Sequence, residues 1–218
     1  KGGFFLTIVN VISQILAVVI NIILARILAP EDFGLIALTT TFMAFIRLFT
    51  SLGFGASVIH GRNSTINQLS SIFWLNIGIC IISFIAIQLS ANFAAEFYDK
   101  EELENLIRLA SLNVLITPIF IIHYKILERD LEFKTISIIN LSGTLIGSIA
   151  AVIAAFQGFG VYALLFQPII SSIVRLILVL INNKWKPKIY FNFQEIKSMV
   201  WYSIKFKGSS TALYFERN

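Results

Sequence analysis

The chain has 218 residues, of which 57% are hydrophobic and only 13% are charged. A soluble domain carries about 25% charged residues, so this composition excludes a water-soluble globular class and predicts an integral membrane protein. The formal net charge of +5 does not indicate nucleic-acid binding, because basic residues in a membrane protein mark its cytoplasmic side.

Six apolar runs are long enough to cross a bilayer, which takes about 20 residues. They are Phe4–Leu28, Gly34–Val58, Gln68–Leu89, Leu103–Ile126, Phe133–Phe156 and Val161–Ile181. The pattern predicts an all-α, polytopic helical bundle, with residues 1–182 forming one six-helix transmembrane lobe.

The composition becomes more polar after the sixth run. Residues 183–193 carry Lys184, Lys186 and Lys188 and are predicted to form a cytoplasmic linker. Residues 194–218 are a less apolar, helical stretch, which predicts the start of a seventh span and of a second, truncated lobe. We therefore expect the chain to be part of a longer protein.

Loop charge predicts the orientation of this bundle. With the N-terminus inside, the inner segments hold nine lysine and arginine residues and the outer segments hold three. The outer loop between the third and fourth spans is acidic, with Glu96, Asp99, Glu101, Glu102 and Glu104. Because basic loops remain in the cytoplasm, the N-terminus is predicted to be cytoplasmic.

The turn between the first two spans has a clear local signature. Pro30 cannot continue the first helix with a hydrogen-bonded amide, and it moves the preceding residue out of the α region. Glu31 and Asp32 then lie where the second helix begins, and their charge suits its positive end. The stretch is predicted to be a helical hairpin.

This stretch also carries a family resemblance. Residues 23–34 read ILARILAPEDFG, and the following apolar helix ends in LGFGASVI at residues 52–59. The pattern resembles the bacterial polysaccharide (Wzx-type, O-antigen) flippases of the multidrug/oligosaccharidyl-lipid/polysaccharide exporter superfamily. The resemblance implies the N-terminal half of a MATE-like transporter, with two six-helix lobes around a central cavity.

The resemblance also implies a function. The expected activity is the transfer of undecaprenyl-diphosphate-linked oligosaccharide repeat units across the bacterial inner membrane, for lipopolysaccharide or exopolysaccharide biosynthesis. A polysaccharide polymerase would be a further candidate partner, in addition to the lipid-linked cargo and the bilayer. An ion or membrane gradient, rather than ATP, would drive transport.

The first span carries a stripe of carboxamides. Asn10, Gln14 and Asn21 are spaced four and seven residues apart, so they share one helix face within about 40°. Such a face is predicted to line a hydrated cavity and to bind substrate. The alternative is hydrogen bonding between helices, which contributes only about 0.6 kcal/mol per bond in membranes.

Arg47, in the second span, is the strongest single candidate for substrate binding. A guanidinium in a span costs about 2.5 kcal/mol or more to insert, so it usually faces a cavity or a partner. Its fork could hold a lipid pyrophosphate. The alternative is a structural ion pair, but no Asp or Glu lies in the middle of the six complete spans.

Two further cations complete the candidate site. Gln167, Ser171 and Arg175 step by four along the sixth span, so Arg175 could line the cavity or extend toward the headgroups. Lys205 would face the first lobe in a two-lobe transporter, or form part of a basic interfacial turn.

Other groups are interpreted as structural. Gly143 and Gly147 form a G-x-x-x-G face that permits close helix packing. His123 is predicted to be a polar tip near the inner interface rather than a proton relay.

The sequence contains no motif for enzymatic chemistry. It lacks a phosphate-binding glycine loop, paired metal ligands and a nucleophile elbow, so we expect no catalytic residue, metal or cofactor. The alternatives to a polysaccharide flippase are a lipid II flippase, a drug/cation antiporter and a non-transporting scaffold for polysaccharide assembly. An antiporter would need a buried carboxylate.

Overall fold

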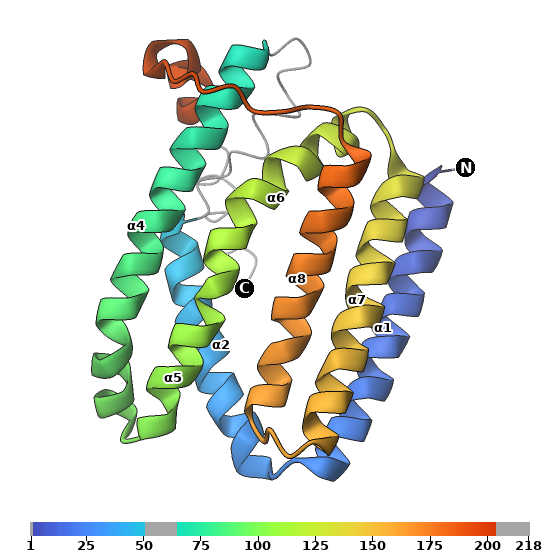
Figure 1. Ribbon diagram of the computed structural model, residues 1–218, viewed down its shortest axis with the longest axis vertical. Helices are drawn as coiled ribbons and strands as arrows, with labels where there is room; N and C mark the ends of the chain where they lie inside the picture. The colour runs from blue at the N-terminus through green and yellow to red at the C-terminus, as the bar shows by residue number, and fades with distance from the viewer. Residues whose placement is uncertain (1, 51–64, 204–218) are drawn as a thin grey trace, which may run out of the picture.

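The computed structural model describes residues 2–50 and 65–203, and most of these residues are helical (Figure 1). Its helices are α1 (Gly2–Ile27), α2 (Pro30–Thr50), α4 (Ile66–Tyr98), α5 (Glu101–Ala110), α6 (Leu112–Arg129), α7 (Phe133–Phe156) and α8 (Tyr162–Asn182). Residues 193–203 form a further helical segment. No strand occurs in these described ranges, which confirms the predicted all-α class.

Most of the helices stand side by side in one row. In Figure 1 the order across the molecule is α1, α7, α8, α6 and α4, with α2 behind α5. The most extensive packing is that of α7 against α8 on one side and α1 on the other. The helices α1 and α2 are therefore consecutive in the chain but pack against different neighbours, since α2 lies on α5 and α4.

Four described helical stretches are long and apolar enough to cross a membrane: Ile66–Tyr98, Glu101–Arg129, Phe133–Phe156 and Tyr162–Asn182. They correspond to the third to sixth predicted spans. The chain is therefore a multi-pass membrane protein. The first two predicted spans are helical over Gly2–Ile27 and Pro30–Thr50, and their crossing of the membrane stays a prediction. The predicted seventh span is helical over 193–203, and its remainder lies outside the described residues.

The turn between α1 and α2 forms as its sequence predicts. α1 ends at Ile27, and Pro30 is the first residue of α2, where a missing amide costs nothing. The Asp32 carboxylate accepts a hydrogen bond from the Ala29 amide at 3.1 Å. The carboxylate thus fixes the turn and places negative charge at the positive end of α2.

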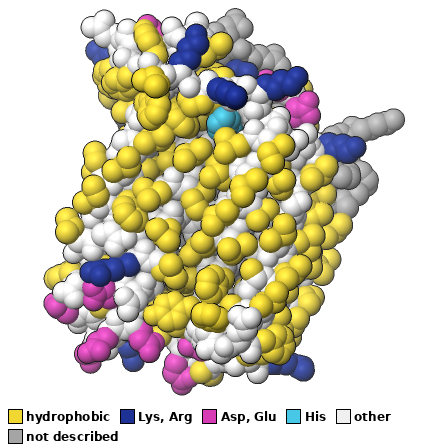
Figure 2. Space-filling model, viewed as in Figure 1, with side chains coloured by type: hydrophobic (Ala, Val, Ile, Leu, Met, Phe, Trp, Pro, Cys, Tyr) yellow, Lys and Arg dark blue, Asp and Glu magenta, His cyan; other side chains and the backbone are white. Residues whose placement is uncertain are grey.

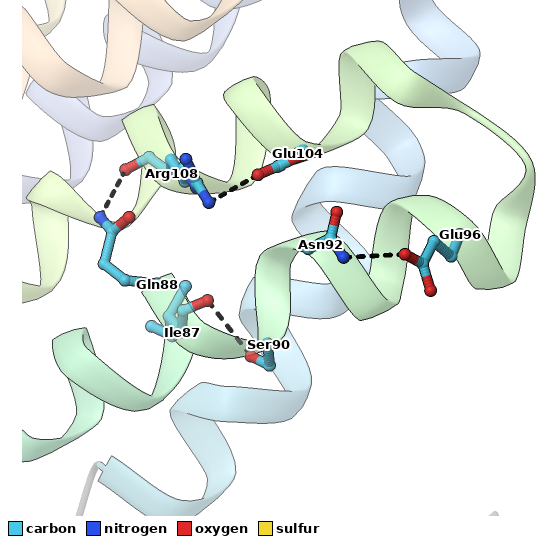
Figure 3. A network of polar contacts seen from close by, with 7 residues as sticks. All are labelled: Ile87, Gln88, Ser90, Asn92, Glu96, Glu104 and Arg108. Carbon is cyan, nitrogen blue, oxygen red and sulfur yellow. Dashed lines mark hydrogen bonds and ion pairs between the residues drawn. The ribbon is translucent and has the colours of Figure 1, made fainter.

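The fourth predicted span is interrupted at Ser111, which separates α5 from α6. The Ser111 hydroxyl donates to the Arg108 carbonyl at 2.6 Å and accepts from Nε2 of Gln88 on α4 at 3.0 Å. Figure 3 shows Gln88 reaching across from α4 toward Arg108, which also pairs with Glu104 within α5. Side chains therefore satisfy polar groups at a break that lies inside the bundle.

The helices α7 and α8 approach closely because α7 carries glycine at the contact. A Cβ on Gly143 would lie 2.5 Å from Cγ of Arg175, and one on Gly147 would lie 2.5 Å from the Gln167 carbonyl. The predicted role of these glycines in packing is confirmed. The connecting turn contains Gly158 and Gly160 with φ of 80° and 53°, values that glycine adopts without strain.

The segment after α8 crosses one end of the bundle to reach α4. We call residues 183–192 the strap; Figure 1 shows it running from the end of α8 to the end of α4. Its backbone amides at Lys188 and Asn192 donate to the hydroxyls of Ser70 and Ser71 on α4, both at 3.0 Å. The segment predicted to be a linker is therefore docked on α4.

Charged side chains gather at the two ends of the bundle. Figure 2 shows an apolar band in the middle, lysine and arginine side chains near the strap, and acidic side chains near the α4–α5 turn. At 33 residues, α4 is about 50 Å long, which exceeds the ~30 Å apolar thickness of a bilayer. The last turns of α4, which the sequence placed beyond the span ending at Leu89, extend toward the acidic end.

We expect Gly147→Ala to destabilise the protein. The added methyl group would collide with the backbone of α8, and overpacking of this kind costs about 1–3 kcal/mol. Gly78→Ala is the matched control, because a Cβ on Gly78 meets nothing within 4 Å. Thermal unfolding of the purified protein in detergent measures both; equal melting temperatures for the two variants would contradict the close α7–α8 contact.

Candidate functional site

The candidate site begins with a line of polar contacts between α7 and α8. Nε2 of Gln167 donates to the Ser148 hydroxyl at 3.2 Å, and the Ser171 hydroxyl donates to the Gly143 carbonyl at 2.8 Å. Gln167, Ser171 and Arg175 share one face of α8, as their spacing of four predicts. We call this line of contacts the α7–α8 polar seam.

Arg175 is the charged member of the polar seam. Its Nη2 donates to the Thr144 hydroxyl on α7 at 2.9 Å. Arg175 lies seven residues before Asn182 at the end of α8, which is about 10 Å along the helix. Its Nε is buried and has no acceptor within hydrogen-bond distance among the described residues. The side chain therefore turns onto α7 and does not extend toward the headgroups.

The polar seam contains a cation but no carboxylate. The described ion pairs are Arg108–Glu104, Lys125–Glu128 and Arg129–Asp130, and all three lie near helix ends. A guanidinium has five donors, and the Thr144 hydroxyl takes one bond in the described structure. The remaining donors make the seam chemically suited to an anion, because phosphate oxygens accept paired hydrogen bonds from a guanidinium.

A further polar contact lies one turn before Thr144 on α7. Nδ2 of Asn140 donates to the Tyr124 hydroxyl of α6 at 3.3 Å. Helices α6, α7 and α8 thus contribute hydroxyl, amide and guanidinium groups to one region of the bundle.

Two members of the carboxamide stripe of α1 lie on an open face. Gln14 and Asn21 are both exposed, whereas Val9, Ile20 and Leu24 on the same helix are buried. The side chains of Ile20 and Leu24 pack with alanines of α7. The two carboxamides thus remain available to a partner or ligand outside the described residues.

The structure does not bring the two halves of the predicted site together. The helix α7 lies between α1, with Gln14 and Asn21, and α8, with Arg175 (Figure 1). The backbone at positions 10 and 47 is helical, but the side chains of Asn10 and Arg47 lie outside the described residues, as does Lys205 altogether. Their predicted roles stay predictions.

Burial overturns the interpretation of His123. The sequence predicts a polar tip, but the residue is 3% exposed and its ring lies 5.0 Å from the ring of Trp185 in the strap. The strap covers this end of α6, with Nδ2 of Asn183 donating to the His123 carbonyl at 2.9 Å. His123 is therefore buried because the strap covers it, and the sequence of α6 alone does not reveal this cover.

The residues that dock the strap and bridge the helix break were not predicted from the sequence. Ser70 and Ser71 form an adjacent hydroxyl pair in the first turns of an apolar helix, and Gln88 is a polar residue within an apolar run. These features were visible, but the partners of Gln88 and of the serines lie about 20 and about 120 residues away. Local patterns do not reveal such distant pairings.

Residues 23–218 match the family described as polysaccharide biosynthesis protein. The chain belongs to this family. The match covers most of the chain and confirms the resemblance first seen in the turn that includes Pro30.

Three relatives of this chain are named for polysaccharide transport or biosynthesis. The succinoglycan biosynthesis transport protein ExoT of Rhizobium meliloti is 27% identical over 190 residues, which are 87% of this chain and 38% of that protein. The teichuronic acid biosynthesis protein TuaB of Bacillus subtilis is 29% identical over 155 residues, covering 70% of this chain and 32% of TuaB.

The lipopolysaccharide biosynthesis protein WzxC of Escherichia coli is 24% identical over 220 residues, covering 100% of this chain and 45% of WzxC. The chain thus spans less than half the length of each of these curated relatives. No solved structure is significantly similar to the chain.

We expect Thr144→Val to lower the free energy of unfolding by about 1–3 kcal/mol, because it leaves a guanidinium N–H of Arg175 without its acceptor. Thr40→Val is the control, since the exposed Thr40 hydroxyl bonds only to the Ala37 carbonyl of its own helix, and its loss should cost below about 0.5 kcal/mol. Denaturation of both purified variants measures the difference. A Thr144 variant as stable as the Thr40 variant would show that the seam bond does not hold Arg175.

Proposed function

We propose that this chain forms one lobe of a flippase that moves a lipid-linked oligosaccharide across the bacterial inner membrane. The observation that carries the proposal is family membership, together with relatives named for succinoglycan transport and for lipopolysaccharide and teichuronic acid biosynthesis. The cargo in this proposal is an undecaprenyl-diphosphate-linked repeat unit. Its diphosphate needs fixed cations, and its sugars need hydrogen-bonding groups along a hydrated path.

The polar groups of the chain suit such a cargo. Exposed carboxamides at Gln14 and Asn21 can both donate to and accept from sugar hydroxyls. Arg175 and, by its place in the sequence, Arg47 supply positive charge within the helices for the diphosphate. The middle of the described spans carries no carboxylate, which favours an anionic cargo over the cationic substrate of a drug antiporter.

A path for the cargo requires a second lobe facing the open side of α1. The relatives are more than twice as long as the segment they share with this chain, which leaves room for a second lobe. Lys205 follows the strap, where that lobe would begin. Alternating access would then rock the two lobes about a site near the bilayer midplane. In this arrangement the docked strap joins the lobes, and the N-terminus is cytoplasmic.

Loss of Arg47 should strongly reduce export. In a strain that lacks its own polysaccharide flippase, the full-length protein should restore surface polysaccharide, and Arg47→Ala should reduce it at least about tenfold, as expected for loss of a charge-assisted anchor. Arg26→Ala is the control, because Arg26 is exposed at the far end of α1. Immunoblots of the membrane fraction confirm equal protein levels.

The results with these variants distinguish the role of Arg47 as an anchor for the diphosphate from the flippase activity of the whole protein. Partial export by Arg47→Lys would show that positive charge matters more than the guanidinium fork. Full export by Arg47→Ala would exclude Arg47 as the anchor and leave the flippase proposal intact. Failure of the wild-type protein to restore export with any lipid-linked cargo would favour a scaffold that does not transport.

The carboxamides of α1 provide an independent test. The double variant Gln14→Leu/Asn21→Leu should lower export without lowering the melting temperature, because both side chains are exposed and take part in no described packing contact. The double variant Ile15→Leu/Ile22→Leu changes exposed apolar neighbours on the same helix and serves as the control. Equal export by the two double variants would argue that the stripe does not contact the cargo.

A further inference from the structure

The three lysines of the strap occupy alternate positions and are exposed. Lys184, Lys186 and Lys188 are exposed, whereas Trp185 and Pro187 between them are partly buried. In extended backbone, alternate residues point to the same side about 7 Å apart. Pro187 favours this conformation, because a proline biases the preceding residue toward extended geometry. The three ammonium groups thus lie along one side of the strap.

The backbone of the strap is held from beneath. Nε1 of Trp74 donates to the Lys188 carbonyl at 2.8 Å, and the Lys188 amide donates to the Ser70 hydroxyl at 3.0 Å. At the other end, the side chain of Asn183 bonds the His123 carbonyl, and the Trp185 ring packs edge-on against Phe73 with centroids 5.9 Å apart. The backbone that carries the lysines is therefore held in place, so little backbone entropy is lost when the lysines bind a ligand.

No acidic side chain neutralises these lysines in the described structure. The ion pairs near this end use Lys125 and Arg129, which bind Glu128 and Asp130. Figure 2 shows that lysine and arginine side chains gather around the strap while the acidic groups gather mostly at the opposite end. The strap lysines thus form an uncompensated positive row at the edge of the apolar band.

The residue after this row is apolar and projects outward. Ile189 is 98% exposed, the largest exposure among the described large hydrophobic residues, and Phe191 and Phe193 are also about half exposed. A row of lysines next to projecting apolar side chains, at the end of a membrane-spanning bundle, matches the headgroup region of a bilayer. There phosphate groups lie above the first methylene groups of the lipid chains.

We propose that residues 184–189 form a binding surface for the headgroups of anionic phospholipids. The lysines bind the lipid phosphates, and Ile189 enters the layer of lipid chains beneath them. The binding fixes the depth of this end of the bundle in the membrane. The proposal is independent of the transported cargo, because lipid retention is measured without transport.

The test compares lipid retention in charge-matched variants. The full-length protein is reconstituted in nanodiscs with equal amounts of phosphatidylglycerol and phosphatidylethanolamine, released into mild detergent, and examined by native mass spectrometry. The wild-type protein should retain phosphatidylglycerol in preference. The triple variant Lys184→Gln/Lys186→Gln/Lys188→Gln should lose this preference at least about fivefold, since each lysine near an anionic surface contributes about that factor.

Two controls make the result specific. The triple variant Arg26→Gln/Lys100→Gln/Lys134→Gln removes the same charge from exposed sites outside the strap and should retain phosphatidylglycerol as the wild type does. Replacing the three strap lysines by arginine should also preserve retention. Equal retention by the wild type and the strap glutamine variant, or equal loss in the control triple, would overturn the proposal.

A photoactivatable cross-linker at position 189 identifies the occupant directly. Adducts with phospholipid support the proposal. Adducts with protein in place of phospholipid would overturn it and assign the strap to a protein contact instead.

Discussion

The guanidinium of Arg175 must be accommodated between two apolar helices, and the packing of the row depends on how this is achieved. Glycine at positions 143 and 147 lets α8 approach α7 closely enough for the arginine stem to lie against the α7 backbone. The Thr144 hydroxyl then accepts one of its hydrogen bonds. Further along α7, alanines pack with Ile20 and Leu24 of α1, so small residues of α7 allow both α1 and α8 to approach it.

A second constraint is that backbone polar groups inside an apolar bundle need partners wherever a helix stops. Side-chain hydroxyls and carboxamides provide them in this protein. Ser111 and Gln88 satisfy polar groups at the break between α5 and α6, and Ser70 and Ser71 bind the backbone of the strap. The strap thereby packs as part of the bundle, and the segment that follows it leaves from a fixed point on α4. In a two-lobe transporter, a fixed joint of this kind would transmit the motion of one lobe to the other.

Features set by neighbouring residues were predicted well from the sequence. Pro30 and Asp32 define the first turn, and Gly143 and Gly147 mark the closest helix contact. Features set by distant partners were not. The break at Ser111 is stabilised by Gln88 of another helix, and His123 is buried by a tryptophan about 60 residues later in the chain. For the candidate site, the roles of Arg175 and the carboxamides stay predictions, and the sequence did not predict which groups they face.

Composition and residue spacing were enough to predict an all-helical membrane protein, the position of most of its apolar helices, and the polar residues that those helices carry. Hydrophobicity, helical spacing and turn chemistry are local properties, so they can be read along the chain. Only the tertiary structure decided that Arg175 turns onto Thr144, that α7 separates it from the carboxamides of α1, and that the strap is docked with its lysines outward. Each of these depends on which helices become neighbours, and that is settled by the fit of side chains from distant parts of the chain.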